Sequence, residues 1–476
     1  MTFNNKVILR GGDILMWDHV ILNGTIVTGN ETFKGNIYVK DGKISAITNE
    51  ILNGEAKEIT DATDLMVLPG LMDTHVHSRD GGAKEKEDFF HSTQAAAAGG
   101  LTTIFEMPNA IPAVTNVERL NAQLKNLTPK AHVDFGMWGL CLGDLNKNDI
   151  EELNKAGVVA FKFFWGYAVN SETYQLVYNY DPTAKDVIPP LRDGEVYKIF
   201  ENVYKTGKLL AIHAENADLM ETLTQRVKDE GDFTYEGLLR ARPNIAEETI
   251  VNTAITFSKA TGTRLHILHA STKEGLKRVE DAKKEGLNVT VETCPHFLFL
   301  NNEDYQRVGP KMKVYPPVKY REDQEKLWEG VKNKSISLVC SDHAPHTAQQ
   351  KDGALWDIPS GMCGVETLAP MMIDAAGRER ISLNEVVQLL SENPAKLFGL
   401  YPNKGSMEIG TDADFTLVDM NMTHVIKEEE LHSISKVTPF DGYETKGYPV
   451  GTIVRGRTVM KYGEIVSEPF GKFIPV

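Results

Sequence analysis

Cysteine is scarce in this chain of 476 residues. The four cysteines form no CxxC pair, and three of them lie in or beside strongly apolar runs; they are Cys141, Cys294, Cys340 and Cys363. This usage argues against a disulfide framework and against a structural zinc site built from cysteines. Reduced, buried thiols are typical of a cytosolic enzyme, so we expect a cytoplasmic protein.

Long apolar runs and an excess of basic residues are also lacking. No stretch of 18 apolar residues occurs, so no segment is expected to span a membrane. The opening residues, MTFNNKVILRGGDILMWD, hold a four-residue apolar patch but no signal-peptide core. Acidic residues outnumber basic ones 66 to 51, for a net charge of -15. A nucleic-acid partner is not expected, because binding without sequence preference needs a basic surface.

The two ends of the chain share short β-branched runs that are broken by Asn-Gly, Asp-Gly and Tyr-Gly turns, a pattern typical of β-hairpins. Examples are HVILNGTIVTGN and NIYVKDGKISAIT near the start, and DFTLVDM and TIVRGRTVMKYGEIV near the end. We expect residues 1–67 and 405–476 to pair into one small β-sandwich domain that is discontinuous in sequence.

Between the ends, eight apolar runs alternate with helical segments. The runs are LPGLMDTHVH, LTTIFEMP, VDFGMWGL, VVAFKFFW, LLAIHAE, RLHILHA, NVTVETCP and ISLVCSDH. Continuous hydrophobicity is typical of strands that are buried on both faces. The segments NVERLNAQLKNL, GEVYKIFENVYKTG and KEGLKRVEDAKKEG have the apolar spacing of amphipathic helices. This alternation predicts an α/β fold, a (β/α)8 barrel over residues 68–404. An open doubly wound sheet is the alternative, disfavoured because no Gly-rich phosphate loop follows the first strand.

Polar side chains gather at the carboxyl ends of the predicted barrel strands, where barrel enzymes place their chemistry. These strand-end residues are His75, His77, His213, His269 and Asp342. A single histidine at such a place is more often a hydrogen-bonded structural residue than a ligand. Side chains from four different strands, however, would converge on one axis, and this favours a metal centre.

The residue types suit divalent metals. Imidazole and carboxylate bind Zn, Mn or Fe-type ions, and the HxH spacing of His75 and His77 puts both rings on one face of a strand. Four histidines exceed what one catalytic zinc usually needs, so we expect two metals. Such a pair generates hydroxide at neutral pH and polarises a carbonyl.

Lys162 lies inside the fourth predicted strand, between apolar neighbours. An unpaired ammonium in apolar surroundings is costly, although a lysine there could still extend its amine to the barrel rim. Alternatively, burial favours the neutral amine. That amine could react with carbon dioxide to give a carbamate, an anion able to bridge two metals.

Nine stretches of the sequence then carry a resemblance that covers essentially the whole chain. They are PGLMDTHVH, AAAAGGLTTIFEMPN, GVVAFKFF, HAEN, HILHASTKEG, VETCPHFLFL, SDHAPHT, ENPAKLFGLYPNKGSMEIGTDADFTLVD and TPFDGYETKGYPVGTIVRGRTV. The chain resembles the amidohydrolase superfamily in its cyclic-amide branch of dihydroorotases, allantoinases and hydantoinases. Relatives in this branch that act as non-catalytic scaffolds have lost ligand positions. All six positions are intact here, so an enzyme is expected.

The resemblance implies a ligand set and a mechanism. Two divalent ions, zinc being the expected metal, would be bridged by carboxylated Lys162. The implied ligands are His75, His77, Lys162, His213, His269 and Asp342. Asp342 would also be the general base, which takes the proton of the bridging hydroxide and passes it to the leaving ring nitrogen.

Three residues match positions that hold the substrate carboxylate in dihydroorotases: Arg79, Asn109 and His346. An arginine fork with two neutral donors suits a carboxylate. A salt bridge across the barrel mouth is the structural alternative for Arg79, and a cap is the alternative for His346. Together the three residues favour a ring that carries a carboxylate.

Other positions resemble hydantoinases and allantoinases instead. Tyr167 matches a tyrosine over the reacting carbonyl, where a phenol could stabilise an oxyanion; the alternative is an ordinary buried aromatic. Tyr315 and Lys319 depart from the dihydroorotase pattern, and Ser360 stands where hydantoinases usually carry asparagine. The insert at 168–193 is expected to cover the pocket or to form an assembly surface.

We therefore expect metal-dependent hydrolysis of a cyclic amide C–N bond in a cyclic ureide, dihydroorotase-like and with preference for a carboxylate-bearing ring. The alternatives are an allantoinase or hydantoinase/dihydropyrimidinase acting on a neutral ring, and a non-catalytic scaffold of the same fold. The resemblance also implies a homo-oligomer, either a dimer or a tetramer.

Overall fold

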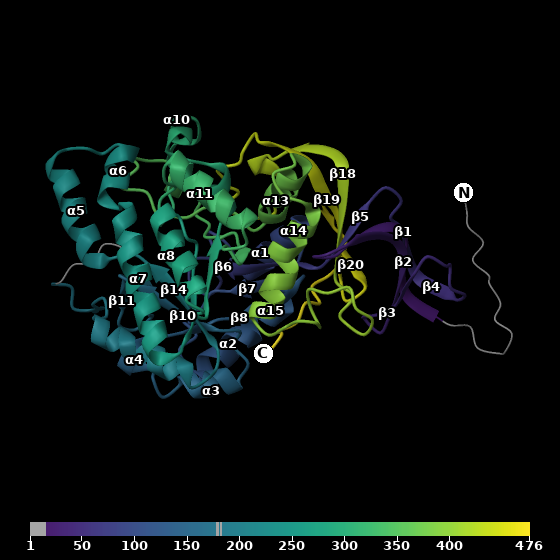
Figure 1. The fold of residues 1–476 in the computed structure, drawn as a ribbon, viewed down its shortest axis with the longest axis horizontal. Coiled ribbons are helices and arrows are strands. Elements are labelled where there is room, and N and C mark those ends of the chain that lie inside the picture. The colour runs from purple at the N-terminus through teal and green to yellow at the C-terminus, as the bar shows by residue number, and fades with distance from the viewer. Residues whose placement is uncertain (1–15, 178–179, 181–182) are drawn as a thin grey trace.

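The structure of the chain is a computed structural model, which describes residues 16–177, 180 and 183–476. Most of the opening segment, in which no signal peptide is expected, lies outside the described residues. So do four residues of the insert predicted after the fourth barrel strand. In Figure 1 a helix-covered body occupies one side of the molecule and a sheet built from both chain ends occupies the other.

A closed ring of parallel strands confirms the predicted barrel and excludes the open sheet. Its strands coincide with the eight apolar runs: β6 (Leu71–Val76), β7 (Leu101–Glu106), β8 (Asp134–Met137) continued by β9 (Gly139–Leu140), β10 (Phe161–Trp165), β14 (Leu209–Ala214), β15 (Arg264–Ile267), β16 (Val289–Thr293) and β17 (Leu338–Val339). The last strand returns to the first through a parallel bridge between Val76 and His343, and the His77 N–H donates to the His343 carbonyl at 2.8 Å.

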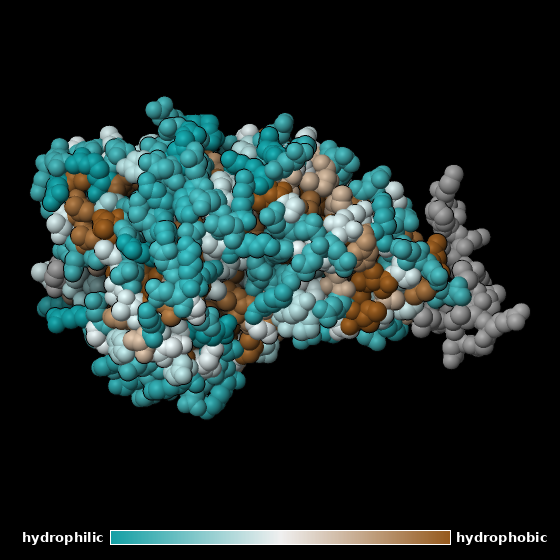
Figure 2. Space-filling view, viewed as in Figure 1, coloured by the Kyte–Doolittle hydropathy of each residue, from teal (hydrophilic) through white to brown (hydrophobic). Residues whose placement is uncertain are grey.

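The three amphipathic segments form helices on the outside of the ring: α2 (Val117–Leu127), α4 (Asp193–Tyr204) and α8 (Lys273–Lys284). Side-chain caps fix two of their starts, because Asn116 accepts from the Arg119 N–H and Thr272 accepts from the Gly275 N–H. Figure 2 shows that the helix-covered face is mostly hydrophilic, as expected for helices with one apolar side. No helix among the described residues has the length and apolar character needed to cross a bilayer.

Other helices complete the shell: α1 (Phe89–Ala98), α3 (Ile150–Lys155), α5 (Ala217–Asp229), α6 (Tyr235–Ala241), α7 (Asn244–Thr261), α9 (Pro295–Phe299), α10 (Tyr305–Val308), α11 (Arg321–Lys332), α12 (Ala348–Lys351), α13 (Leu368–Gly377), α14 (Leu383–Val387) and α15 (Asn393–Leu397). The insert after β10 forms a small antiparallel sheet from β11 (Ala168–Asn170), β12 (Leu176–Val177) and β13 (Val187–Ile188).

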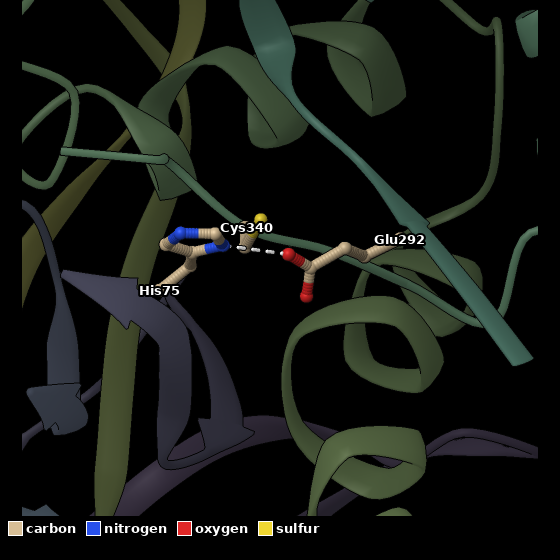
Figure 3. A group of neighbouring side chains, drawn as sticks. All are labelled: His75, Glu292 and Cys340. Carbon is tan, nitrogen blue, oxygen red and sulfur yellow. Dashed lines mark hydrogen bonds and ion pairs between the residues drawn. The ribbon is translucent and has the colours of Figure 1, made fainter. Parts of the chain in front are cut away.

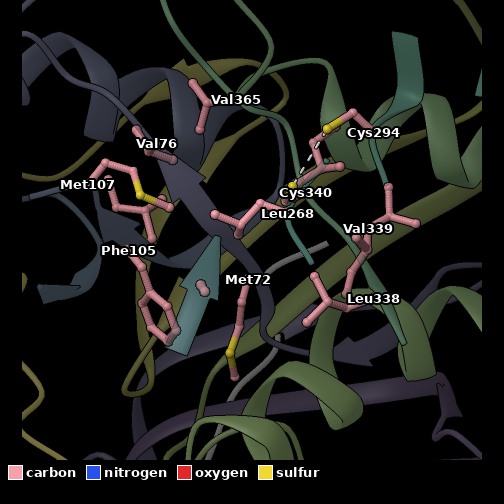
Figure 4. Packing of buried hydrophobic residues seen from close by; sticks show 14 of the residues in the cluster. Met72, Val76, Phe105, Met107, Leu268, Cys294, Leu338, Val339, Cys340 and Val365 are labelled. Atoms are coloured by element: carbon pink, nitrogen blue, oxygen red, sulfur yellow. Dashed lines mark hydrogen bonds between the residues drawn. The ribbon is translucent and has the colours of Figure 1, made fainter. Parts of the chain in front are cut away.

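The barrel core holds the predicted buried thiols. All four cysteines are free and buried. Cys294 and Cys340 follow the neighbouring strands β16 and β17, and their sulfur atoms lie 3.6 Å apart among aliphatic side chains (Figure 4). Burial raises the pKa of both thiols. They are therefore held as neutral core residues.

Both chain ends contribute to one nine-stranded sheet. Its strands are β1 (Met16–Val27), β2 (Thr32–Lys40), β3 (Lys43–Thr48), β4 (Glu55–Asp61), β5 (Met66–Pro69), β18 (Phe415–Val425), β19 (Glu444–Val454), β20 (Arg457–Lys461) and β21 (Glu464–Ile465). The two ends meet where β5 pairs antiparallel with β18. Residues from both ends, such as Ile37 and Phe415, share a small separate core.

The sheet connects to the barrel through a short link on the N-terminal side, and the C-terminal segment forms hydrogen bonds with the barrel. Only Gly70 separates β5 of the sheet from β6 of the barrel. At the C-terminus, Gly471 and Ile474 donate N–H bonds to Ala131 and Phe135 of the barrel at 2.8 and 2.9 Å. The division into 1–67 with 405–476 and 68–404 stays a prediction.

A buried ion cluster connects barrel and sheet. The Lys404 ammonium lies 2.6 Å from carboxylate oxygens of Asp134 and Asp414 and 3.0 Å from Asp412. Arg455 also pairs with Asp134. Burial opposes the charged form of Lys404, but the carboxylates of Asp414 and Asp134 outweigh it and raise its pKa.

Removing this ammonium should destabilise the fold. Lys404→Met would leave buried carboxylates without their central partner, which costs about 3–5 kcal/mol in unfolding free energy. Urea unfolding measures the change, with Lys332→Met at an exposed position of α11 as the control. A loss no larger than that of the control would contradict this role of the cluster.

Candidate metal centre

The strand-end histidines predicted to converge lie side by side. The ring centroids of His75 and His77 are 5.3 Å apart, those of His75 and His269 are 5.4 Å apart, and those of His213 and His269 are 4.7 Å apart. All four side chains are buried. Burial lowers the pKa of each ring, which keeps the imidazoles neutral, the form that binds metals.

Glu292 of β16 orients His75. Its carboxylate accepts from His75 Nδ1 at 2.8 Å (Figure 3). It also accepts from His266 Nε2 at 3.1 Å. Although burial opposes ionisation, these hydrogen bonds lower the pKa of Glu292, which is thus a carboxylate. Because Nδ1 of His75 carries the proton, Nε2 presents a lone pair. That Nε2 is buried and has no hydrogen-bond partner.

His77 is oriented in the same way by Asn109, whose side-chain oxygen accepts from His77 Nδ1 at 2.8 Å. This leaves Nε2 of His77 facing Asp342, 3.8 Å from its carboxylate oxygen. The structure therefore places Asn109, which the sequence predicted to contact substrate, against a predicted metal ligand. Asn109 also lines a chamber that adjoins this site.

His213 belongs to a chain of charged groups. Its Nε2 donates to Glu215 at 2.9 Å, and Arg242 donates to the same carboxylate at 2.6 Å. Burial opposes ionisation of Glu215, but Arg242 and the His213 hydrogen bond lower its pKa to about 2. Nδ1 of His213 then faces Nε2 of His269 at 3.0 Å. Both histidines line the same cavity as His75 and His77.

Lys162 is fully buried, and its Nζ has no hydrogen-bond partner among the described residues. The Nζ lies 4.5 Å from the centroid of the Phe164 ring. Burial lowers the pKa of the ammonium. The side chain therefore does not extend to the barrel rim. Its amine lies in the cavity with the four histidines and Asp342.

Asp342 completes the cluster. Its carboxylate oxygen is 3.3 Å from Nε2 of His75, and burial raises its pKa. His75, His77 and Asp342 present ligand atoms that lie within 4.8 Å of one another. Nε2 of His75 and Nζ of Lys162 have no hydrogen-bond partner among the described residues, and both side chains line one cavity with Asp342, a donor set that fits divalent metal ions.

Strained backbone marks the same place. His269, Asp342 and Arg79 adopt positive φ angles of 36°, 49° and 60°. Non-glycine residues rarely hold such angles, which occur in turns and at functional sites, and these three residues line one cavity. The strain aims the side chains of three different barrel loops at one cavity.

Tyr167 lines that cavity and lies against His213, with ring centroids 4.9 Å apart. Its hydroxyl donates to Glu215 at 3.3 Å and accepts from Arg242 at 3.3 Å. The guanidinium of Arg242 in turn covers the ring of Tyr315, 3.5 Å from its centroid, and Tyr315 forms a wall of the same cavity. Lys319 donates to the Arg242 carbonyl.

A second chamber of about 210 Å³ opens beside the metal cavity and shares His77, Arg79 and Leu176 with it. Arg79, Lys86 and His346 contribute to its lining. His346 Nε2 donates to the Ser360 carbonyl at 2.9 Å, while its buried Nδ1 has no partner. Arg79 forms no ion pair with any carboxylate of the described residues, so the salt bridge considered from the sequence is absent there.

Sequence reasoning missed the residues that orient the ligands: Glu292, Glu215 and Arg242. Two of them carried a usable signal. Glu292 is a charged residue inside an apolar strand, the same feature that singled out Lys162, and Glu215 stands two residues after His213. Arg242 lies between two helices and carried none.

Comparison with known proteins agrees with this architecture. The amidohydrolase family model matches residues 66–459. The chain is 33% identical over 467 residues to an L-hydantoinase of Paenarthrobacter aurescens, covering 96% of this chain and 98% of that protein. It is 36% identical over 462 residues to an allantoinase of Rubrobacter xylanophilus, covering 96% and 97%.

Solved structures give the same answer. An L-hydantoinase (dihydropyrimidinase) from Arthrobacter aurescens superposes with a TM-score of 0.90 at 32% identity, covering 97% of this chain and all of that one. A D-hydantoinase superposes with a TM-score of 0.85 at 29% identity, covering 96% and 98%. The expected carboxylate preference finds no support in these relatives, which agree with the hydantoinase and allantoinase alternative. The chain belongs to the amidohydrolase family.

Proposed function

We propose that this enzyme hydrolyses an amide C–N bond in a five-membered cyclic ureide of the hydantoin type. The observation that carries the proposal is the convergence of four neutral histidines, one buried amine and one buried carboxylate at the barrel mouth. The relatives named hydantoinase and allantoinase support the choice of ring.

In this proposal two divalent metal ions, zinc being the expected metal, bind the ligands predicted from the sequence. The proposed ligands are His75, His77, Lys162, His213, His269 and Asp342. When bound, the metals lower the pKa of a water molecule and polarise the ring carbonyl. Lys162 contributes as a carbamate, because its buried amine favours the neutral form that reacts with carbon dioxide.

Asp342 moves the proton. Its carboxylate takes a proton as water attacks the ring carbonyl, and it gives that proton to the ring nitrogen as the C–N bond breaks. Tyr167, held between Glu215 and Arg242, lines the cavity on the His213 side, and we propose that its single O–H leaves Glu215 and donates to the oxygen that becomes negative. The products are a carboxylate and a ureido nitrogen on one open chain. Assembly as a homo-oligomer stays a prediction.

One observation favours a more specific substrate, a ring with an acidic substituent. The guanidinium of Arg79, which pairs with no carboxylate of the described residues, lies between the metal cavity and the chamber that Lys86 and His346 also line. A carboxylate on the substituent would pair with it through charge-assisted hydrogen bonds.

Ring-opening assays test both the ring-hydrolase proposal and the preference for an acidic substituent. The substrates are hydantoin, allantoin, dihydrouracil, dihydroorotate and hydantoin-5-acetate. We expect turnover of five-membered rings. Arg79→Ala should lower kcat/KM for the acidic hydantoin on the order of 10- to 100-fold more than for hydantoin itself, since a hydrogen bond to a charged group contributes about 1.5–3 kcal/mol. Equal losses of kcat/KM on both rings would contradict the preference for an acidic substituent. The absence of turnover on every ring would contradict the ring-hydrolase proposal.

Glu292 offers a test that needs no substrate. Glu292→Gln keeps the shape of the side chain but removes the charge that holds the protons of His75 and His266. Metal affinity should fall about 10- to 100-fold. Competition with a chromogenic chelator measures it, with Glu303→Gln at an exposed site as the control. Unchanged affinity would contradict the orienting role.

A further inference from the structure

Two buried lysines beside the metal cavity are satisfied entirely by main-chain carbonyls. The Lys313 ammonium donates to Leu355, Trp356 and Ile358 at 2.7, 3.3 and 2.6 Å. The Lys351 ammonium donates to Lys313, Pro359 and Gly361 at 3.0, 3.1 and 2.8 Å. The two side chains are 3% and 4% exposed. Neither forms an ion pair with a carboxylate in the part of the chain that the structure describes.

Most of the six carbonyls belong to one segment, residues 355–361. This segment folds around the two ammonium groups, which bind its carbonyls. This segment ends at the pocket, because Ser360 and Gly361 line the metal cavity. The Gly361 N–H donates to the Lys313 carbonyl at 3.0 Å, and the Ser360 carbonyl accepts from His346. Hydrogen bonds from the two lysines thus hold this segment in place at its middle and at its end.

The fit at the pocket end is close. Gly361 has a φ of +126°, and a Cβ there would lie 2.3 Å from the Ala344 carbonyl oxygen. On the opposite side, Lys313 is followed directly by Val314 and Tyr315, which form another wall of the cavity. Lys351 connects the two walls, since it binds the carbonyl of Gly361 in one and the carbonyl of Lys313, which directly precedes Val314 in the other.

We propose that Lys313 and Lys351 are positioning residues that set the distance between two walls of the substrate pocket and thereby determine ring binding. They touch no proposed metal ligand in the structure, so they act on substrate affinity and leave the metal centre intact. The inference rests on the proposed function for its kinetic readout. Its structural readout does not depend on any substrate.

The first measurement is hydrogen–deuterium exchange of Lys351→Met. Without the ammonium, three buried carbonyls lose their donor, and the segment around 355–361 loses its anchor. Peptides that contain Gly361 should exchange faster than in the wild type, while barrel strand β10 keeps its protection. Unchanged exchange across 355–361 would overturn the proposal even if no substrate is found.

The second measurement is kinetic, on whichever ring the wild type opens. KM should rise on the order of 10- to 100-fold, the size of effect expected when a positioning group shifts by about 1 Å. Bound metal and kcat should stay within about threefold of the wild type, because a rise in KM alone marks lost ground-state binding. Equal falls in kcat and metal content would overturn the proposal, because they would show general damage to the site.

Rescue separates positioning from damage. Lys351→Ala opens a space for an added alkylammonium ion, and n-propylammonium should restore part of the lost affinity by donating to the same carbonyls. Tetramethylammonium, which has no N–H, should not, and equal restoration by both ions would count against the carbonyl cage. If Lys351→Met does not fold, Lys351→Gln keeps two donors and should show an intermediate KM; a wild-type KM in that variant would overturn the proposal. Lys332→Met is the control.

Discussion

Asp342→Asn should lower kcat for ring opening about 10³- to 10⁴-fold, the upper range for a positioned acid–base group. The amide keeps the size of the side chain, but it cannot take a proton during attack or give one to the leaving ring nitrogen. Asp342 is buried beside His75 and His77, and the described residues place no other carboxylate within 4.8 Å of both rings. No neighbour can therefore replace it.

Two measurements make this result specific. Steady-state kcat is compared with that of Asp374→Asn, which removes a buried carboxylate on α13, outside the pocket. Metal content is measured in both variants, since Asp342 is also a proposed ligand. If Asp342→Asn retained more than about a tenth of wild-type kcat with its metals bound, another group would have to carry the proton.

The second large effect is expected at Lys162. Lys162→Ala removes the only amine in the cavity that the described chain lines, and with it the proposed bridging carbamate. Activity should fall at least about 10³-fold, because metal assistance supplies several kcal/mol of transition-state stabilisation. Bound metal should fall as well.

Mass spectrometry of the intact protein gives an independent readout. The wild type prepared with bicarbonate and zinc should carry the mass of one added carbon dioxide, and peptide analysis should assign it to Lys162. Lys162→Arg keeps a cation but cannot form a carbamate, so it should lack both the added mass and the activity. An active Lys162→Arg variant would exclude a role for the carbamate.

The barrel could be predicted because strands buried on both faces leave a continuous apolar record. The convergence of the polar side chains could be predicted because they stand at the ends of those strands. Lys162 was visible for a related reason, as a charge inside such a run. The sheet of both chain ends was visible in its turn residues. These features are local, so one sequence is enough to find them.

What could not be predicted depends on tertiary contacts. The partner of His75 is 217 residues away, and that of His77 is 32 residues away. The sequence predicts that Asn109 contacts substrate, because its closeness to His77 is visible only in the folded barrel. Nothing in the sequence singles out Lys313 or Lys351, and only the fold shows their carbonyl partners. Substrate preference depends on such contacts, which is why it was predicted less well than the convergence of the strand-end side chains.

We propose, as the central claim, that six side chains from five barrel strands form one metal centre that opens a cyclic ureide. The most direct test is elemental analysis of the wild type and of the His75→Asn, His77→Asn double variant, together with ring-opening activity before and after chelation. The account predicts about two divalent metals per wild-type chain, far fewer in the double variant, and activity that is lost on chelation and restored by zinc. Stoichiometric metal in the double variant, or full activity after the metal is removed, would contradict it.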